Sequence, residues 1–174
     1  VLMSMFYAFK ASGFWIEERE SNLLDGAAHF YDTYECADQK FLAVGSIEPQ
    51  FYSVLLEKLE ISDLKFQDQH NKELWPELKT IMKEKIKEKT RDEWADIFDG
   101  TDACVAPVLN LSEAPAHHHM KARNSFVEVD GVIQPAPAPR FSDTTTSIKH
   151  SSVKAGENND EICAKYNLDR SCFN

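Results

Sequence analysis

The chain has 174 residues, of which 43% are hydrophobic, so it is long enough for one globular domain with its own core, with or without a tail. Its 29 acidic residues outweigh its 19 lysines and arginines and give a formal net charge of -10. Proteins that bind nucleic acid gain much of their affinity by neutralising phosphates with basic side chains. The acidic balance therefore argues against a nucleic-acid partner.

Residues 1–24 are apolar at first and then charged from Glu17 to Glu20, which indicates a linker built as a helix or strap. The apolar run Val1–Phe9 is too short to cross a bilayer and lacks the basic leader of a signal peptide. The closing residues Ser171–Asn174 do not match a peroxisomal signal of the Ser-Lys-Leu type. We therefore expect no membrane contact, and no targeting signal is visible in the sequence.

Residues 25–133 combine short β-type runs with amphipathic segments and are expected to form a small α/β domain. Phe30–Glu35 and Lys40–Gly45 flank Ala37-Asp-Gln39, a pattern that predicts a β-hairpin. Gln39 stands where the turn imposes a positive φ, which costs a residue other than glycine roughly 1 kcal/mol.

Three helices are expected after this hairpin. Apolar residues recur at helical spacing over 49–60 and again over 72–89, and the second of these segments carries a Lys- and Glu-rich face typical of contact with solvent. Thr90-Arg-Asp-Glu93 has the spacing of a capping box and predicts the start of a third helix, which Gly100 is placed to end.

The remainder of the chain carries weaker signals. Ala103–Val108 is short, apolar and interrupted by proline, as expected of an edge strand. Ser112–Ala116 predicts a short helix, and Phe126–Val132 predicts a second hairpin around Asp130-Gly131. Residues 134–174 are expected to form an extended connector followed by a C-terminal segment. The extended connector covers Gln134–Arg140. A polar loop is expected over 142–158, and a short helix near Asp160–Asn167.

The most informative candidate is Glu48, in the strand-to-helix corner Phe41–Phe51. Pro49 suits the first position of a helix, whereas the cap before it is usually Ser, Thr, Asp or Asn. Two interpretations stay open on local grounds. Glu48 is either a solvated carboxylate that the helix dipole stabilises, or a group that apolar neighbours such as Ile47 partly remove from water for a functional role.

Other candidates are weaker. The side chains of His117-His-His119 point in different directions and rarely converge on one ion, so we expect an exposed loop and no metal. Asp99-Gly-Thr-Asp102 lacks the further ligands of a calcium loop. The four cysteines contain no C-x-x-C pair, which favours free thiols over zinc ligands or disulfides.

Five segments occur in a distinctive order: Asn22-Leu-Leu-Asp-Gly26, Tyr34-Glu-Cys-Ala-Asp38, Ala43-Val-Gly-Ser-Ile-Glu-Pro-Gln-Phe51, Ile97-Phe-Asp-Gly-Thr-Asp-Ala-Cys-Val105 and Lys121-Ala-Arg-Asn-Ser-Phe126. Together they closely resemble the acyl-CoA racemases of the class III CoA-transferase family. The resemblance covers most of residues 20–140 and thins from residue 141 onward.

The chain departs from the family at two glycines. The family's Asp-Gly-Gly-Ala-Pro reads Asp25-Gly-Ala-Ala-His29 here, and its Arg-Gly-Ser-Phe reads Arg123-Asn-Ser-Phe126. The loss of glycine suggests a relaxed backbone constraint at these positions or a diverged copy of the enzyme.

The resemblance implies an α/β fold in which this chain supplies the small domain and the segment that returns to a Rossmann-like large domain, itself absent from the chain. In the family, two such chains interlock as a homodimer. The implied reaction interconverts (R)- and (S)-2-methylacyl-CoA thioesters by removing and returning the α-proton. CoA is part of the substrate, so no separate cofactor is implied. The resemblance also implies a mitochondrial or peroxisomal location and a role in fatty-acid and bile-acid metabolism.

The resemblance also assigns residues to the site. The family's catalytic His and Asp lie in the absent amino-terminal half, so we expect this chain to be inactive alone. Glu48 falls where a family glutamate is hydrogen-bonded to that histidine, and its carboxylate is implied to orient the imidazole and favour its protonated form. Tyr31 and Ile47 fall where family members line the acyl pocket, and in the family the tyrosine is contributed across the dimer.

Two alternatives remain open. A class III CoA transferase moves CoA between carboxylic acids through an aspartyl thioester, and a glycine-rich loop is expected near this corner in transferases. Gly45-Ser-Ile-Glu-Pro49 occupies that place here and favours the racemase. The other alternative is a truncated or diverged copy without catalytic activity that pairs with the full-length enzyme.

Overall fold

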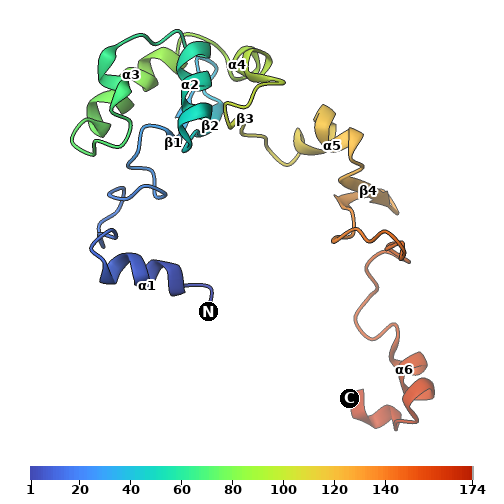
Figure 1. Cartoon of the computed structure of the whole chain (residues 1–174). Coiled ribbons are helices and arrows are strands. Elements are labelled where there is room, and N and C mark those ends of the chain that lie inside the picture. Colours follow the sequence, from blue (N-terminus) through green and yellow to red (C-terminus); the bar gives the residue numbers. More distant parts are fainter. Residues whose placement is uncertain (174) are drawn as a thin grey trace. The chain divides into compact units, whose positions relative to one another are not determined.

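The computed structural model describes residues 1–173, except the side chain of Cys172, and it divides the chain into two compact units (Figure 1). The first unit comprises Val1–Val108 and the second Leu109–Asn174. This division follows the packing within the chain. The expected boundaries after residues 24 and 133 concern the complete enzyme and stay predictions.

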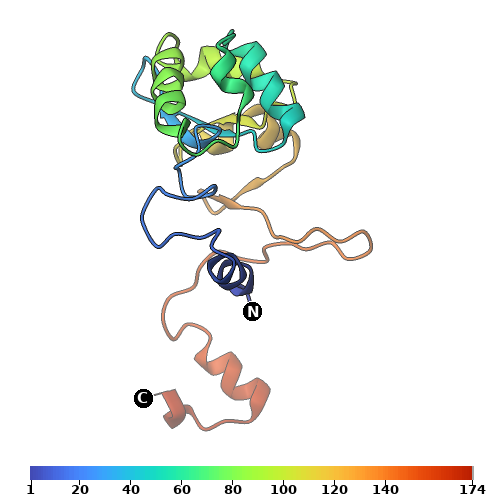
Figure 2. The ribbon, with the colours of Figure 1, turned by 60° about the vertical axis from the view of Figure 1, so that its left-hand side comes forward.

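The first unit is a three-stranded antiparallel sheet with helices packed on one face. The strand order is β1-β2-β3, and Figures 1 and 2 show the helices α2, α3 and α4 gathered above the strands. In chain order its elements are α1 (Ser4–Ala11), β1 (Tyr31–Glu35), β2 (Phe41–Gly45), α2 (Pro49–Lys58), the 3-10 helix η1 (Leu64–Gln67), α3 (Trp75–Ile86), α4 (Arg91–Phe98) and β3 (Val105–Pro107).

The hairpin of β1 and β2 confirms the prediction made from the sequence. Tyr31 lies opposite Gly45 and Glu35 opposite Phe41, and Gln39 in the turn has a φ of 62°. The expected strand at Ala103–Val108 is confirmed as β3, which pairs with β2 at the edge of the sheet.

The helix boundaries follow the local capping signals. α4 starts at a complete capping box between Thr90 and Glu93, and Gly100 follows its end with a φ of 69°, as predicted. The second helix is shorter than expected: α3 covers Trp75–Ile86 rather than 72–89. Pro76 stands in the first turn of α3, where proline is accepted because the N–H that it lacks would have no helical partner there.

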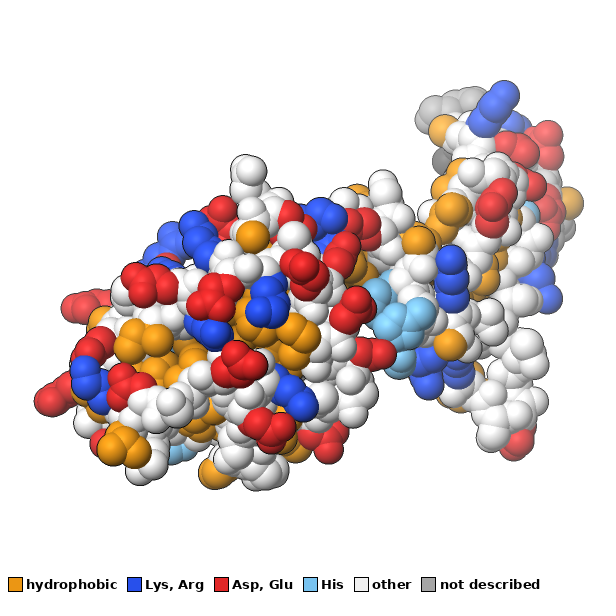
Figure 3. All heavy atoms as spheres, turned by 90° about the horizontal axis from the view of Figure 1, so that it is seen from above, with side chains coloured by type: hydrophobic (Ala, Val, Ile, Leu, Met, Phe, Trp, Pro, Cys, Tyr) orange, Lys and Arg blue, Asp and Glu red, His pale blue; other side chains and the backbone are white. Residues whose placement is uncertain are grey.

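The core lies between the helices and the covered face of the sheet. Tyr34, Leu42 and Val44 from the strands are buried there, because alternate residues of a strand point to the same face. The outer face of the helices carries interspersed lysines and acidic residues with apolar side chains between them (Figure 3). Lys83 and Glu84 of α3 are exposed, so the expected solvated face is confirmed.

His29 is a core residue rather than a surface group. Its Nε2 lies 2.7 Å from the hydroxyl of Tyr52 in α2, and its ring meets Phe30, Tyr52 and Phe66 edge-on. Burial, with a smaller contribution from His70, lowers the pKa of His29 to about 4 from an ordinary value of 6.5. The folded chain therefore holds a neutral imidazole at neutral pH.

The second unit contains short elements without a core. Its elements are η2 (Ala114–Ala116), α5 (His118–Ala122), the hairpin strands β4 (Phe126–Val129) and β5 (Val132–Pro135), α6 (Asn159–Tyr166) and η3 (Arg170–Phe173). The β4–β5 hairpin turns at Asp130 and Gly131, whose φ values are both positive, as the sequence predicts. Across the residues described from 109 onward, none is buried.

The structure describes several local features that the sequence singled out. His118 and His119 begin the helix α5, so the predicted loop at His117–His119 is wrong. Cys36, Cys104 and Cys163 are free thiols, whereas the side chain of Cys172 lies outside the described residues. Over residues 1–173, no helix is long and apolar enough to cross a membrane, and no three His, Cys, Asp or Glu side chains are arranged to hold a metal ion.

The strained turn gives a first testable prediction. Gln39→Gly is expected to raise the free energy of unfolding by up to about 1 kcal/mol, because glycine adopts positive φ without the steric cost that glutamine meets. Urea unfolding followed by tryptophan fluorescence measures the change, since Trp75 and Trp94 are buried in this unit. Ala37→Gly in the same turn is the matched control and is expected to lower stability; equal effects of the two changes would contradict the argument.

Buried His29 gives a second prediction, on pH. Above pH 6.5 the histidine is neutral in both states; as the pH falls toward 4, the unfolded chain binds a proton that the folded chain refuses, so stability is lost. Below pH 4 both states are protonated and the loss is complete, at about 3 kcal/mol. His29→Gln is expected to remove this part of the pH dependence. Urea unfolding of both proteins from pH 8 to pH 3.5 tests it, and parallel stability curves would refute it.

Candidate functional site

The candidate site is the corner where β2 passes into α2. Glu48 is the N-cap residue of α2, with an extended backbone (φ -74°, ψ 142°) that suits a residue before proline. Its carboxylate makes no capping hydrogen bond within residues 1–173, and its side chain is exposed. In this chain the apolar neighbours thus leave the carboxylate of Glu48 in contact with solvent, where a group from outside the chain can reach it.

The backbone before Glu48 is fixed by segments that are distant in sequence. The N–H of Gly45 donates to the carbonyl of Cys104 at 2.9 Å, and the N–H of Ser46 donates to the carbonyl of Phe30 at 3.0 Å. Ser46 is fully buried, and its hydroxyl donates to the carbonyl of Ala103 at 2.5 Å. Every donor of this turn in the chain is thus satisfied inside the protein, which holds the corner in one conformation.

Gln69 completes the corner. Its side-chain Nε2 donates to the carbonyls of Ser46 at 3.1 Å and Ile47 at 2.9 Å. Its own backbone carbonyl accepts the indole N–H of Trp75 at 2.8 Å, which ties Gln69 to the start of α3. The sequence analysis missed this residue, because a glutamine in a polar loop carries no local signal of burial.

Tyr31 and Ile47, the other two candidates, lie in different surroundings near the corner. Tyr31 is half-buried at the start of β1, directly opposite Gly45. Ile47 packs its side chain against the hydrophobic core beside α2. The structure therefore places Tyr31 on the open face of the sheet and Ile47 against its helical side.

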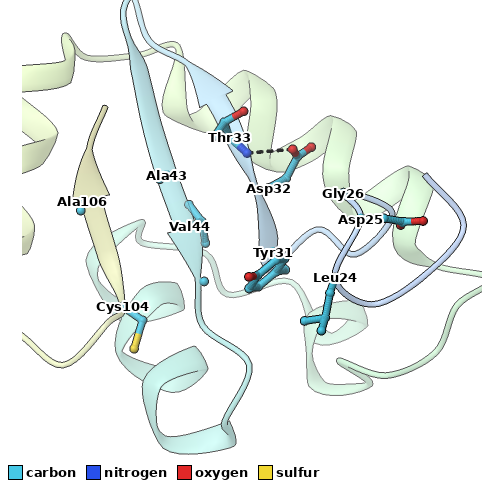
Figure 4. Close-up of a pocket in the computed structure, with 11 residues that line it drawn as sticks. Leu24, Asp25, Gly26, Tyr31, Asp32, Thr33, Ala43, Val44, Cys104 and Ala106 are labelled. Carbon is cyan, nitrogen blue, oxygen red and sulfur yellow. Dashed lines mark hydrogen bonds between the residues drawn. The ribbon is translucent and has the colours of Figure 1, made fainter. Parts of the chain in front are cut away.

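A hollow of about 460 Å³ lies on the open face of the sheet (Figure 4). This volume falls in the range of small-molecule sites, roughly 300–1,000 Å³. Tyr31 forms part of its wall. The full lining is Leu24, Asp25, Gly26, Tyr31, Asp32, Thr33, Ala43, Val44, Gly45, Cys104 and Ala106.

The acidic rim of the hollow is held by hydrogen bonds and one ion pair. Burial raises the pKa of Asp25, but hydrogen bonds from Asn22 and Ser21 outweigh it and leave this pKa below its usual range. Asp32 pairs with the ammonium of Lys79 in α3 at 2.5 Å, and the same ammonium donates to the carbonyl of Gly26. Lys79 thus connects α3 to both the sheet and the loop that walls the hollow.

Cys104 joins the hollow to Glu48. Its backbone has a φ of 54°, and its exposed thiol lines the hollow. Burial, then the nearby carboxylates of Glu48 and Asp102, raise the pKa of the Cys104 thiol. The thiol is therefore protonated at neutral pH. Gly45 donates its N–H to the Cys104 carbonyl and lies three residues before Glu48, so Cys104 lines the end of the hollow nearest the corner that carries Glu48.

The sequence profile of CoA-transferase family III matches residues 2–159. The chain belongs to this family. The chain also aligns with alpha-methylacyl-CoA racemase from mouse, at 42% identity over 169 residues, and with the human protein of that name, at 40% over 172 residues. These matches cover 95% and 97% of this chain but 44% and 45% of the relatives, so the chain spans less than half the length of the racemases it matches.

Solved structures of the family share the fold. A CaiB/BaiF family protein from Brucella suis matches this chain with a TM-score of 0.65 at 22% identity. The match covers 95% of this chain and 44% of that protein. Rv3272 from M. tuberculosis matches 91% of the chain with a TM-score of 0.64 at 13% identity. The expected α/β fold of a class III CoA-transferase small domain is therefore confirmed.

The positions where the chain departs from the family pattern differ in their backbone: Asn124 has a positive φ, and Ala27 does not. Asn124, where the family has glycine, adopts a φ of 48°, so the expected relaxation of the backbone is wrong at this position. Asparagine tolerates the left-handed region better than other residues that have a side chain. His29, where the family has proline, gains a hydrogen-bond partner in Tyr52. Both substitutions are thus accommodated by the fold.

The corner yields a third prediction. Gln69→Ala is expected to lower the free energy of unfolding by about 1–3 kcal/mol, because the carbonyls of Ser46 and Ile47 lose the amide that they share. Urea unfolding followed by tryptophan fluorescence measures this loss. Gln67→Ala is the matched control, since Gln67 is exposed in the neighbouring 3-10 helix. A loss at Gln69 no larger than that at Gln67 would show that the amide does not fix the corner.

Proposed function

We propose that this chain is the small-domain and carboxyl-terminal part of a racemase that interconverts (R)- and (S)-2-methylacyl-CoA thioesters. Two relatives named alpha-methylacyl-CoA racemase support the proposal, each at 40% identity or more over nearly the whole chain. The observation that carries it is Glu48, an exposed carboxylate on a fixed corner within the racemase-like segment Gly45-Ser-Ile-Glu-Pro49, beside a hollow of substrate size.

Glu48 is proposed to act through a histidine that the rest of the enzyme supplies. A carboxylate that accepts the N–H of an imidazole fixes the ring's tautomer and raises its pKa, since the negative charge favours the imidazolium. That histidine, with an aspartate on the other side of the substrate, exchanges the α-proton beside the thioester carbonyl. Glu48 is thus a positioning residue, and the chain alone is expected to be inactive.

The partners follow from the same proposal. The substrate carries its own CoA, so no further cofactor is required, and Tyr31 is proposed to contact the acyl group, with Ile47 supporting the corner from behind. The described part of the second unit has no buried residue, and apolar side chains such as Leu111 and Phe141 are exposed, which supports packing against the large domain or a second copy in a homodimer. By the family resemblance we propose a mitochondrial or peroxisomal location, in fatty-acid and bile-acid metabolism.

The fourth prediction tests Glu48 in a chimera in which this chain replaces the matched part of the mouse racemase. Glu48→Gln is expected to lower α-proton exchange by on the order of 10²-fold, the lower end of the effect of a positioned acid–base group. The histidine limb of the pH–rate profile is expected to move to lower pH, because the neutral amide no longer favours the imidazolium. Deuterium uptake from D₂O into a 2-methylacyl-CoA, followed by mass spectrometry, measures the rate.

Glu57→Gln, at an exposed position on the same helix, is the matched control and is expected to leave rate and pH profile unchanged. An inactive chimera with intact fold and Glu48 in place would support the non-catalytic copy instead. Acyl-CoA-dependent labelling of an aspartate, with transfer of CoA to an added carboxylate, would support the CoA transferase. Exchange unaffected by Glu48→Gln would remove the role assigned to this residue.

A further inference from the structure

The floor of the hollow is made of very small residues from adjacent strands. Ala43 of β2 and Ala106 of β3 are cross-strand partners, and Gly45 lies two positions further along β2 (Figure 4). A methyl group added at Gly45 would lie 3.7 Å from the Cys104 carbonyl and 3.8 Å from Cε2 of Tyr31. At Gly45, Tyr31 and Cys104 leave no more than van der Waals distance for a side chain, so the hollow is narrow at this end.

The floor has a direction relative to Glu48. The Gly45 and Cys104 end is the one nearest the corner that carries Glu48, because Gly45 ends β2 three residues before Glu48 and its N–H donates to the Cys104 carbonyl. Because a strand advances about 3.3 Å per residue, Ala43 and Ala106 lie about 7 Å further along the sheet. If the reacting carbon of an acyl group is held near Glu48, only atoms of that group several bonds beyond this carbon would reach Ala106.

The rim decides which part of an acyl-CoA the hollow suits. Asp25 and Asp32 place carboxylates at its edge, and the one ammonium recorded among them, that of Lys79, is already paired with Asp32. Phosphate groups are repelled by such a rim, whereas Leu24 and Tyr31 offer apolar surface. The charges and the lining both favour an uncharged hydrocarbon chain over the nucleotide of CoA.

We infer that the alanine pair Ala43–Ala106 sets how far an acyl chain can extend beyond the reacting carbon, and so determines the chain-length specificity of the proposed racemase. This inference rests on the proposed function, because it takes the reacting carbon to lie at the Glu48 end. Two methyl groups leave the far end of the floor open, so long or branched acyl chains can cross it. A larger side chain at Ala106 would close that path and leave the Glu48 end unchanged.

The fifth prediction compares two substrates in the chimera with the mouse racemase. Ala106→Leu is expected to lower kcat/KM for a long substrate, 2-methylmyristoyl-CoA, by tenfold or more, since even one methylene in an apolar pocket changes kcat/KM by about 10–200-fold. The value for a short substrate, 2-methylbutanoyl-CoA, is expected to stay unchanged. Ala106 is exposed, so leucine can be accommodated without displacing core side chains, and Ala106→Val serves as a smaller second variant.

Ala37→Leu, which adds the same bulk at an exposed position of the β1–β2 turn, is the matched control and is expected to change neither value. Equal losses for both substrates, or no loss for the long one, would overturn the inference while leaving the proposed function intact. A wild-type chimera inactive on both substrates would instead refute the proposed function.

A binding measurement on the 174-residue chain provides a readout that does not need activity. Methyl NMR signals of Ala43 and Ala106 are expected to shift when the N-acetylcysteamine thioester of 2-methylmyristic acid is added, and to shift less with that of 2-methylbutyric acid. Ala106→Leu is expected to remove the difference between the two probes. Shifts confined to residues outside the hollow would overturn the inference even if the chimera is active.

Discussion

The structure depends on the hydrogen bonding of one buried turn. Between Gly45 and Ile47 the chain leaves the sheet and enters α2, and Ser46 is completely removed from water there. Peptide groups in such a position must find partners in the protein, because an unpaired buried group costs about 1–3 kcal/mol. The partners come from Phe30, from Ala103–Cys104 and from Gln69, so the turn gathers the start of β1, the start of β3 and the loop before α3 around itself.

This turn links packing to chemistry. Because its backbone is fixed from three directions, the N-cap residue Glu48 points out of a rigid base rather than out of a mobile loop. A fixed backbone reduces the reorganisation needed when a group binds the carboxylate, and electrostatic stabilisation is most effective when little reorganisation is needed. The same turn sets Gly45 against Tyr31 and Cys104, and so places one end of the hollow beside Glu48.

The two units differ in what stabilises them. The first buries a continuous cluster of aromatic and aliphatic side chains around His29, Phe30 and Trp75. The described residues of the second include none that is buried, and they rely on local hydrogen bonds and turns. A segment of this kind cannot offset its conformational entropy by burial within itself. Family membership gives a reason: in a chain that spans less than half of its racemase relatives, surfaces that another part of the enzyme covers are left open.

Local sequence determined several elements whose cause lies within a few residues. The Thr90–Glu93 capping box, the strained Gln39 turn, the Asp130-Gly131 hairpin and the Pro49 helix start were all predicted, because caps, turns and periodicity act over one or two helical turns. The exposure of Glu48, the role of Gln69 and the hollow over Ala43 and Ala106 were decided by tertiary structure. Ser46 and Ala103 are 57 residues apart, and Gln69 lies 23 residues from Ser46. No local pattern records such pairs, since they exist only once the sheet and helices have brought these segments together.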